Sequence, residues 1–281
     1  MTSESKKAIV GVAHCFGKVC QGQTACNGGD RRTSTERAES AAVSWLLADG
    51  TMNPNIVYFP FGREANVQQF SKQVELKPAC FRPTETSTTI IFGVARGGTT
   101  MAARVVSSLG IDLAEGSNIN FEDEQFNLQK LGLNPKRDEQ QLRDHLLKRL
   151  EQRNSQHNHW GWKYPSAAAY LPLILERVRN PRLVCILRDP LASSSRQLRA
   201  DAIQQQGNEE RRLRQAIRAM ETNIALMHQN AHPTLMVSYE KAIQKPAHFV
   251  RALALFLGIE PTAQAIDAAL GQIQPGGYLQ G

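Results

Sequence analysis

Residues 90–110 read IIFGVARGGTTMAARVVSSLG, an apolar run that passes through a glycine-containing turn into a helical pattern. The run before the turn is continuous and rich in β-branched residues, which is typical of a strand buried inside a parallel sheet. After the turn, apolar residues recur at the spacing of one helix face: Met101, Ala102, Val105, Val106 and Leu109. Gly110 then provides a suitable helix end. A strand, a glycine turn and a helix N-terminus together form a setting for anion binding.

The chain beyond this stretch repeats the alternation of strands and helices. Further strands are expected at three places: 159–163 (HWGWK), 182–189 (RLVCILRD) and 234–240 (TLMVSYE). Apolar periodicity predicts helices around 142–150, from about Asn208, and from Pro246 to Gly258. The second of these has a heptad-like apolar face: Leu213, Ile217, Met220, Ile224 and Met227. The pattern predicts a P-loop-NTPase-like three-layer α/β fold, with a central, mostly parallel sheet flanked by helices.

Residues 1–85 differ in texture from the rest of the chain. They are rich in Gly, Asn, Ser, Thr and Gln, and NGGDRRTSTER at 27–37 is typical of an exposed loop. Three runs look ordered: 8–14, 41–47 and 55–61. We therefore expect an N-terminal extension at 1–85, to which the sequence assigns no function, and one α/β domain at 86–281.

Composition and charge limit the kinds of partner. The 281 residues carry a formal net charge of +7, which favours anionic partners such as nucleotides, sulfated or acidic substrates, nucleic acid or a membrane surface. No apolar run approaches the roughly 20 residues that span a bilayer, so we expect no membrane span and a cytoplasmic protein. The five cysteines include Cys15, Cys20 and Cys26, whose spacings fit no common zinc pattern. Reduced thiols and no metal site are expected.

The glycine turn departs from the usual nucleotide-binding loop in one important position. In the pattern GxxxxGK[ST], backbone N–H groups wrap phosphates, the Lys reaches the outer ones and the Ser or Thr holds Mg²⁺. Gly93, Gly98 and Thr100 keep that frame, but Thr99 stands where the Lys would be, and Arg96 supplies a cation inside the loop. Such a loop can hold an anion, but it is poorly equipped for Mg-ATP.

The loop sequence ARGGTT resembles the 5′-phosphosulfate loop of the sulfotransferases, typically PKSGTT or PRSGTT, whose donor is 3′-phosphoadenosine 5′-phosphosulfate (PAPS). Three further stretches are similar to this family in the same order: WGWKYPSA at 160–167, LVCILRDPLASSS at 183–195 and VSYEKAIQKPAHFVRALALFLGI at 237–259. The resemblance covers roughly residues 88 to 260. Because four elements coincide in order, the combination is much more specific than any one of them.

This resemblance implies a metal-independent transfer of a sulfuryl group from PAPS to a hydroxyl or amine. The acceptor would be a small molecule or a glycan, with no nucleic acid partner. The implied ligands of the 5′-phosphosulfate are Arg96, Gly97, Gly98, Thr99 and Thr100. Lys163 would supply a further cation to the sulfuryl group, and Arg188 would bind the 3′-phosphate together with a serine hydroxyl.

Two positions depart from the pattern of the family. The usual interval from the arginine to the serine of the 3′-phosphate segment is eight residues, but the eighth residue after Arg188 is Arg196. The hydroxyl would then come from Ser193, Ser194 or Ser195. Cytosolic members have a catalytic His two residues after the strand lysine, whereas Pro165 occupies that place here. Because proline cannot act as a base, another proton acceptor is needed.

The stretch NINFEDEQF at 118–126 offers that acceptor. It contains Phe121 followed by Glu122, similar to an aromatic-Glu pattern whose Glu is the base in another branch of the family. A carboxylate beside an aromatic ring, in a site that excludes water, can have its pKa raised toward neutrality. The resemblance therefore implies catalytic roles for Glu122, Lys163 and Arg96.

Neighbouring residues allow other interpretations. His157 and His159 are alternative bases, because they precede the strand residues that lead to Lys163. Asp123 and Glu124 are interpreted as parts of a solvated acidic loop.

Two other functions stay open at this point. A P-loop kinase would use the loop frame and would hold magnesium with Asp189, although this residue could equally start a helix beside Pro190. A non-catalytic module that binds an anion or glycan would fit the basic charge and the missing histidine. The sequence carries no readable code for the acceptor or for the oligomeric state.

Overall fold

The computed structural model describes residues 56–58, 86–113, 120–194 and 209–274. Within these ranges, five strands form one sheet: β1 (Ile56–Tyr58), β2 (Ser87–Gly93), β3 (His159–Lys163), β4 (Pro181–Leu187) and β5 (Thr234–Ser238). Their order across the sheet is β1-β5-β4-β2-β3, and every neighbouring pair is parallel. The parallel sheet predicted from the sequence is therefore confirmed.

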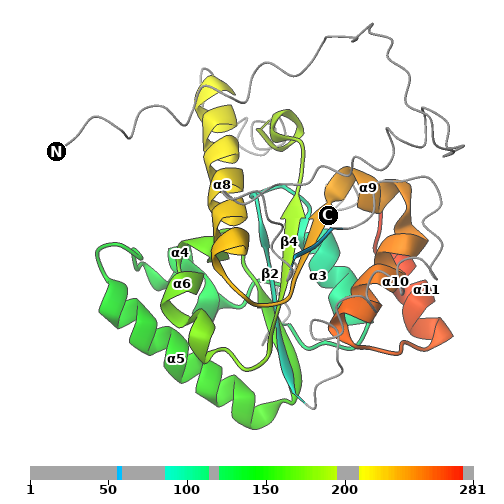
Figure 1. The fold of residues 1–281 in the computed structure, drawn as a ribbon, viewed down its shortest axis with the longest axis horizontal. Coiled ribbons are helices and arrows are strands. Elements are labelled where there is room, and N and C mark those ends of the chain that lie inside the picture. The colour runs from blue at the N-terminus through cyan, green and yellow to red at the C-terminus, as the bar shows by residue number, and fades with distance from the viewer. Residues whose placement is uncertain (1–55, 59–85, 114–119, 195–208, 275–281) are drawn as a thin grey trace, which may run out of the picture. The chain divides into compact units, whose positions relative to one another are not determined.

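Helices cover both faces of this sheet. The longer ones are α3 (Thr99–Ser108), α5 (Glu139–Gln156), α8 (Glu209–Gln229), α10 (Pro246–Leu257) and α11 (Ala263–Gly271). Shorter turns complete the connections: α4 (Leu128–Leu131), α6 (Leu171–Ile174), α9 (Tyr239–Gln244), η1 (Glu124–Phe126), η2 (Ala167–Ala169) and η3 (Leu175–Arg177). In Figure 1, α5, α6 and α8 lie on one side of the strands, and α3, α10 and α11 lie on the other. This is the three-layer α/β architecture that the alternating pattern predicts.

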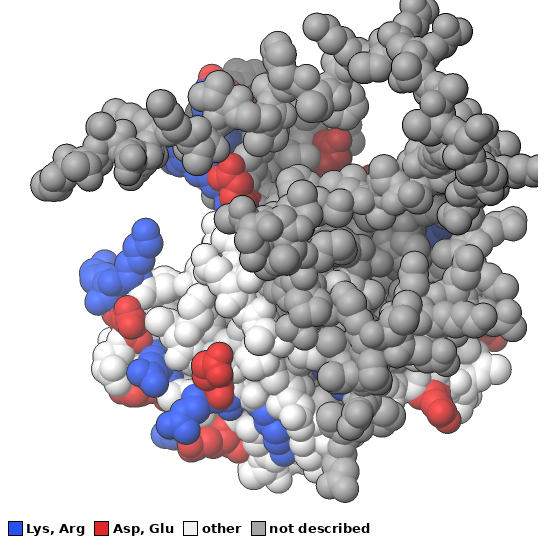
Figure 2. Space-filling model, in the orientation of Figure 1, with Lys and Arg blue, Asp and Glu red and all other residues white. Residues whose placement is uncertain are grey.

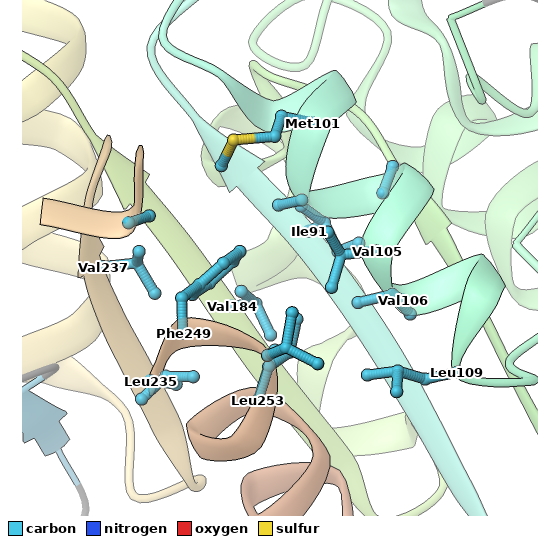
Figure 3. Packing of buried hydrophobic residues seen from close by; sticks show 14 of the residues in the cluster. Ile91, Met101, Val105, Val106, Leu109, Val184, Leu235, Val237, Phe249 and Leu253 are labelled. Atoms are coloured by element: carbon cyan, nitrogen blue, oxygen red, sulfur yellow. The ribbon is translucent and has the colours of Figure 1, made fainter. Parts of the chain in front are cut away.

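Each face of the sheet buries its own apolar cluster, because successive strand residues point to opposite sides. Ile91 and Val184 point toward α3 and α10 and pack with Phe249 (Figure 3). Ile90 and Leu183 belong to the second cluster, which contains buried residues of α5, α6 and α8. With both faces buried, the strands have continuous apolar runs rather than alternating ones. The apolar faces predicted for α3, α5 and α10 are buried as expected.

Two details differ from the sequence prediction. The β5 strand ends at Ser238, whose hydroxyl accepts the Lys241 N–H, so Tyr239 and Glu240 are helical rather than extended. In α8, Ile217 of the predicted apolar face is 40% exposed. The residues that α8 buries are Ala216, Asn223, Leu226 and Met227. The packed face of this helix is therefore rotated from its heptad-like face, because burial also accepts small and polar residues that the heptad reading ignores.

Of the N-terminal 85 residues, the structure describes only β1, which pairs with β5 at one edge of the sheet. A strand from this region therefore belongs to the sheet of the α/β domain. The runs at 8–14 and 41–47, and the cysteines that precede residue 27, lie outside the described residues. The domain boundary after residue 85 stays a prediction.

The surface of the described part carries mixed charge where it is visible. Lys and Arg side chains are interspersed with Asp and Glu side chains over the region of α5 in Figure 2. None of the helices in the described ranges is long and apolar enough to cross a membrane. In the same ranges, no group of three or more His, Cys, Asp or Glu side chains could hold a metal ion.

Candidate active site

The carboxyl ends of the parallel strands meet at one edge of the sheet. The β2 strand ends at Gly93, β3 at Lys163, β4 at Leu187 and β5 at Ser238. Ligands of open parallel sheets bind in the crevice outside these ends. The loops that follow the four strands are therefore the candidate site.

The glycine loop after β2 turns sharply into α3. The Gly97 N–H donates to the Val94 carbonyl at 2.8 Å, and Arg96 has a left-handed φ of 60°. Gly98 has φ 99° and ψ 10° and caps the N-terminus of α3. The first amides of a helix have no partner inside it, and the helix dipole makes this end positive. The loop therefore presents N–H groups and partial positive charge to an anion.

The residues that follow β4 and β5 hold this loop in place. A Cβ added to Gly98 would lie 2.2 Å from Cδ2 of Tyr239, so only glycine allows the ring to approach. The Arg188 guanidinium lies over the same ring, 4.5 Å from its centroid. The Arg188 Nη1 also donates to the Arg96 carbonyl at 3.1 Å. Three strand ends are thus joined through one tyrosine ring and one guanidinium.

Glu240 ties two of these strand ends together. Its Oε1 accepts the Asp189 backbone N–H at 3.1 Å and lies 3.9 Å from Arg188 Nε. Its Oε2 accepts the Ser238 hydroxyl at 3.2 Å. Neither Tyr239 nor Glu240 received a role from the sequence, although the YE pair at 239–240 was the available signal.

A pocket of about 250 Å³ opens beside the glycine loop. Its lining residues are Ala95, Arg96, Gly98, Thr99, Thr100, Asn120, Glu122, Gln129, Lys163, Tyr164, Pro165 and Ser166. The three residues with predicted catalytic roles, Arg96, Glu122 and Lys163, therefore come together in one place. Gly97 is buried within the loop.

Lys163 and Glu122 make the central contact of this pocket. The Lys163 Nζ donates to Glu122 Oε1 at 2.7 Å, with 1% of the lysine side chain and 21% of the glutamate side chain exposed. The Asn127 Nδ2 donates to the other oxygen, Oε2, at 2.9 Å. Burial lowers the pKa of Lys163; the Glu122 carboxylate opposes this effect, and the positive charge of Arg96 adds to it. A cation and a carboxylate thus face the same small volume.

Tyr164 also lines the pocket but cannot serve as the base. Burial raises the pKa of its phenol, and the negative charge of Glu122 raises it further. The phenol therefore stays protonated near neutral pH, and in that form it can donate a hydrogen bond.

A second pocket of about 110 Å³ shares Ala95 and Ser166 with the first. Ser193 lines it and is 2% exposed, and its Oγ has no hydrogen-bond partner among the described residues. The Ser194 Oγ donates to a backbone carbonyl three residues earlier, at 3.0 Å. Ser195 lies outside the described residues. Of Ser193 and Ser194, which both line this pocket, only Ser193 has a hydroxyl without a hydrogen-bond partner among the described residues.

Arg212 of α8 brings a cation to this second pocket. The apolar periodicity of α8 does not point to this residue, although the basic run RRLR at 211–214 is a signal for it. Arg188, which was predicted to bind an anion here, is not among the lining residues of either pocket and contacts the glycine loop instead. A buried hydroxyl and a guanidinium form a second place for an anionic group.

Residues 89–263 match the model of the sulfotransferase family, which is more than half of the 281-residue chain. The chain belongs to this family. The matched stretch contains every lining residue of both pockets. A comparison with curated protein sequences finds no match.

Several solved sulfotransferase-like structures resemble the backbone at low sequence identity. Retinol dehydratase in complex with androsterone and the inactive cofactor PAP is 13% identical, with a TM-score of 0.42 over 69% of this chain. A mouse sulfotransferase complexed with PAP is 12% identical, with a TM-score of 0.45 over 69% of this chain. The chain covers 66% of the length of each, just under two thirds. A sulfotransferase from Alicyclobacillus acidocaldarius is 15% identical, with a TM-score of 0.44 over 64% of this chain and 85% of that one.

The alternative bases lie far from the pocket of this sulfotransferase-family chain. His159 begins β3 and Lys163 ends it, so about 13 Å separates them at roughly 3.3 Å per residue. The His159 Nδ1 lies 2.9 Å from the Ser87 Oγ, at the start of β2. His157 caps the end of α5, with its Nε2 3.4 Å from Asp112 Oδ2. Both histidines therefore lie at the amino end of β3, whereas the pocket lies at its carboxyl end.

The acidic stretch around Glu122 is only partly solvated. Glu124 is exposed and lies 3.5 Å from the Lys130 ammonium, as the sequence interpretation expects. Asp123 is instead buried, and the Arg149 Nη2 of α5 lies 3.3 Å from its Oδ2. The interpretation of Asp123 as solvated is wrong, because a partner 26 residues away in the chain withdraws it from water.

We expect Gly98→Ala to destabilise the fold more than Gly110→Ala. Both glycines have nearly the same φ, 99° and 97°, so both alanines carry a left-handed backbone penalty of about 1–2 kcal/mol. An added Cβ at residue 110 meets no atom within 4 Å, whereas at residue 98 it meets the Tyr239 ring, which should cost about 1–3 kcal/mol more. Urea unfolding of the two variants measures this difference. Equal losses would contradict the proposed role of the ring.

Proposed function

We propose that this chain transfers a sulfuryl group from PAPS to a hydroxyl or amine of a small-molecule or glycan acceptor, without a metal ion. The observation that carries the proposal is the 2.7 Å contact of Lys163 with Glu122 beside the glycine loop. It supplies a cation for a leaving phosphate and a carboxylate for the proton of the acceptor within one pocket. The resemblance of the loop and of residues 183–195 to the donor-binding stretches of the family names PAPS as the donor.

The first pocket suits the 5′-phosphosulfate end of the donor. Gly98 lines this pocket at the N-terminus of α3, where backbone N–H groups can approach an anion. Thr99 and Thr100 start α3, where amides and hydroxyls are available to bind negative oxygens. Arg96 and Lys163 add two cations to the same lining. This donor set matches a doubly anionic group better than a neutral one.

The second pocket suits the 3′-phosphate. It adjoins the first through Ala95 and Ser166, so one extended donor could occupy both. The Ser193 hydroxyl, which has no partner within the described ranges, and the Arg212 guanidinium would hold the phosphate there. The contacts of Arg188 favour a role in holding the glycine loop, and its direct contact with the donor stays a prediction.

Charge explains how these residues would accelerate the transfer. PAPS supplies the sulfuryl group, and its departure leaves negative charge on the 5′-phosphate. Lys163 is held by Glu122 before the reaction, so it would stabilise that developing charge without reorganising water, and Arg96 would add a second positive charge. Glu122 would accept the acceptor proton as the new S–O bond forms. Burial strengthens both effects, since the lysine is only 1% exposed.

The two rival functions have less support. Asp189, the residue that a kinase would use for magnesium, accepts the Ala192 N–H with its Oδ1 at 3.0 Å and so caps the following helical turn. Thr99 also replaces the lysine that reaches the outer phosphates of ATP. The family match favours transfer over a purely binding module, since a buried lysine needs a counter-charge in either case. A cytoplasmic location and the lack of nucleic acid partners stay predictions.

Thermal unfolding tests the donor class. In the presence of EDTA, 3′,5′-ADP should raise the melting temperature in proportion to the logarithm of its concentration, because a ligand bound only by the native state stabilises it. Mg-ATP, assayed separately without EDTA, should give a much smaller shift. A larger shift with Mg-ATP, or transfer activity that EDTA abolishes and Mg²⁺ restores, would favour the kinase.

Ser193→Ala should weaken binding of 3′,5′-ADP about 10- to 100-fold, which corresponds to about 1.5–3 kcal/mol for a hydrogen bond to a charged group. Binding of 5′-AMP, which lacks the 3′-phosphate, should change little. Ser194→Ala is the matched control, because its hydroxyl already donates to a backbone carbonyl. Isothermal titration calorimetry measures all four affinities. A selective loss with Ser194→Ala alone would move the assignment to that serine.

Glu122→Gln should lower kcat by roughly 10² to 10⁴ while leaving 3′,5′-ADP affinity nearly unchanged. The amide keeps the shape of the side chain and one acceptor oxygen, but its NH₂ group replaces the second oxygen and it cannot accept a proton at neutral pH. Transfer of radiolabelled sulfate from PAPS to an acceptor found by screening measures the turnover. If Glu122→Gln keeps near-full turnover and His157→Ala or His159→Ala does not, a histidine is the base.

A further inference from the structure

The loop that carries Glu122 is anchored one residue further on by a buried ion pair. Asp123 is 2% exposed, and Arg149 of α5 is 6% exposed. The Arg149 Nη2 donates to Asp123 Oδ2 at 3.3 Å. The other carboxylate oxygen, Oδ1, accepts the Gln125 backbone N–H at 2.9 Å and caps η1. The Asp123 side chain thus binds the loop backbone at Gln125 and also binds Arg149 of the long helix α5.

We propose that Asp123 and Arg149 are a positioning pair that holds Glu122 at the reaction centre. This inference rests on the proposed role of Glu122 as the base. Neither residue lines the pocket, so the pair would act through the loop and not by touching the donor or the acceptor.

The backbone beside Glu122 needs such a restraint. Phe121 has a left-handed φ of 56°, which is uncommon for a bulky aromatic residue and persists only where the surroundings impose it. The side chain of Glu122 is tied to Lys163 and Asn127. A bound donor would compete for the lysine, because its phosphate also attracts that ammonium. Asp123 and Arg149 are outside this competition and keep their contact in either state.

The second anchor of the loop connects it to the strand that carries Lys163. Phe126 stacks on Trp162 of β3, with ring centroids 4.2 Å apart and planes 11° from parallel. Trp162 directly precedes Lys163. The separation of the carboxylate and the ammonium is therefore set by two rigid elements, α5 through Arg149 and β3 through Trp162.

The chemical nature of the first anchor fits positioning better than stabilisation. A buried ion pair adds little net stability, because the desolvation of two charges offsets their attraction. It is directional, however, since a guanidinium and a carboxylate bind only in restricted geometries. An apolar contact at this point would bury similar area without fixing the direction of the neighbouring side chain.

Asp123→Asn tests the pair with little change of shape. The variant keeps an oxygen for the Gln125 N–H and loses the charged contact with Arg149. We expect kcat to fall roughly 10- to 100-fold, because small misplacement of a reacting group has effects of this size. The KM for PAPS and the affinity for 3′,5′-ADP should stay within about twofold, since the glycine loop is unchanged. Glu124→Gln, one residue further on and exposed, is the matched control with wild-type turnover.

A double-variant cycle separates positioning from a general structural effect. In the Glu122→Gln background, Asp123→Asn should cause no further loss of kcat, because the group it positions is already inactive. An additive loss in the double variant would overturn the inference. If Asp123→Asn does not fold, Arg149→Lys gives the same readout, since it keeps the charge and removes the planar fork.

The outcomes also separate this inference from the proposed function. Full turnover of Glu122→Gln would remove the base role on which the positioning pair rests, while transfer from PAPS with another base would leave the proposed function standing. A large loss in Glu122→Gln, with Asp123→Asn and Arg149→Lys equal to Glu124→Gln, would overturn only the positioning pair.

Discussion

The burial of one ammonium group constrains the whole site. Lys163 is 1% exposed, and an unpaired charge at that depth would cost several kcal/mol. Glu122 compensates it at 2.7 Å, so the loop from Phe121 to Asn127 has to cross over the end of β3. In a donor complex, phosphate oxygens would take over part of that compensation. The same desolvation cost therefore favours both the pairing of Lys163 with Glu122 and the binding of an anion beside Lys163.

The glycine loop is equally dependent on residues from other strands. Arg96 and Gly98 both have positive φ angles in this loop. An isolated turn of the same sequence would not be restricted to this backbone conformation. The Tyr239 ring and the Arg188 guanidinium fix that conformation from β5 and β4. Glu240 then joins Arg188 to the start of the next helical turn through the Asp189 N–H. The anion site is thus a property of three adjacent strand ends and not of the loop sequence alone.

Local patterns were sufficient to predict the fold and to indicate which residues lie together beside the glycine loop. Continuous apolar runs indicate strands buried on both faces, and the glycine turn indicates the position of Arg96 and Thr100 at the edge of the sheet. What failed depends on distant partners. The sequence does not show that Asp123 is buried, because this depends on its contact with Arg149 of α5. It also does not show that Arg212 lines a pocket, because this depends on the packing of α8 near Ser193. The exposed Ile217 shows the same limit, because periodicity gives a helix but not which of its sides is covered.

The pairing of β1 with β5 has a consequence for the self-association of the protein. The three residues Ile56–Tyr58 cover the outer edge of β5, whose Leu235 and Val237 are fully buried. Without that cover, a row of N–H and C=O groups beside apolar side chains would be open to any other extended chain. Such an edge is a template for strand addition between molecules. A short strand contributed from far upstream therefore covers this edge of the α/β domain against strand addition by another copy.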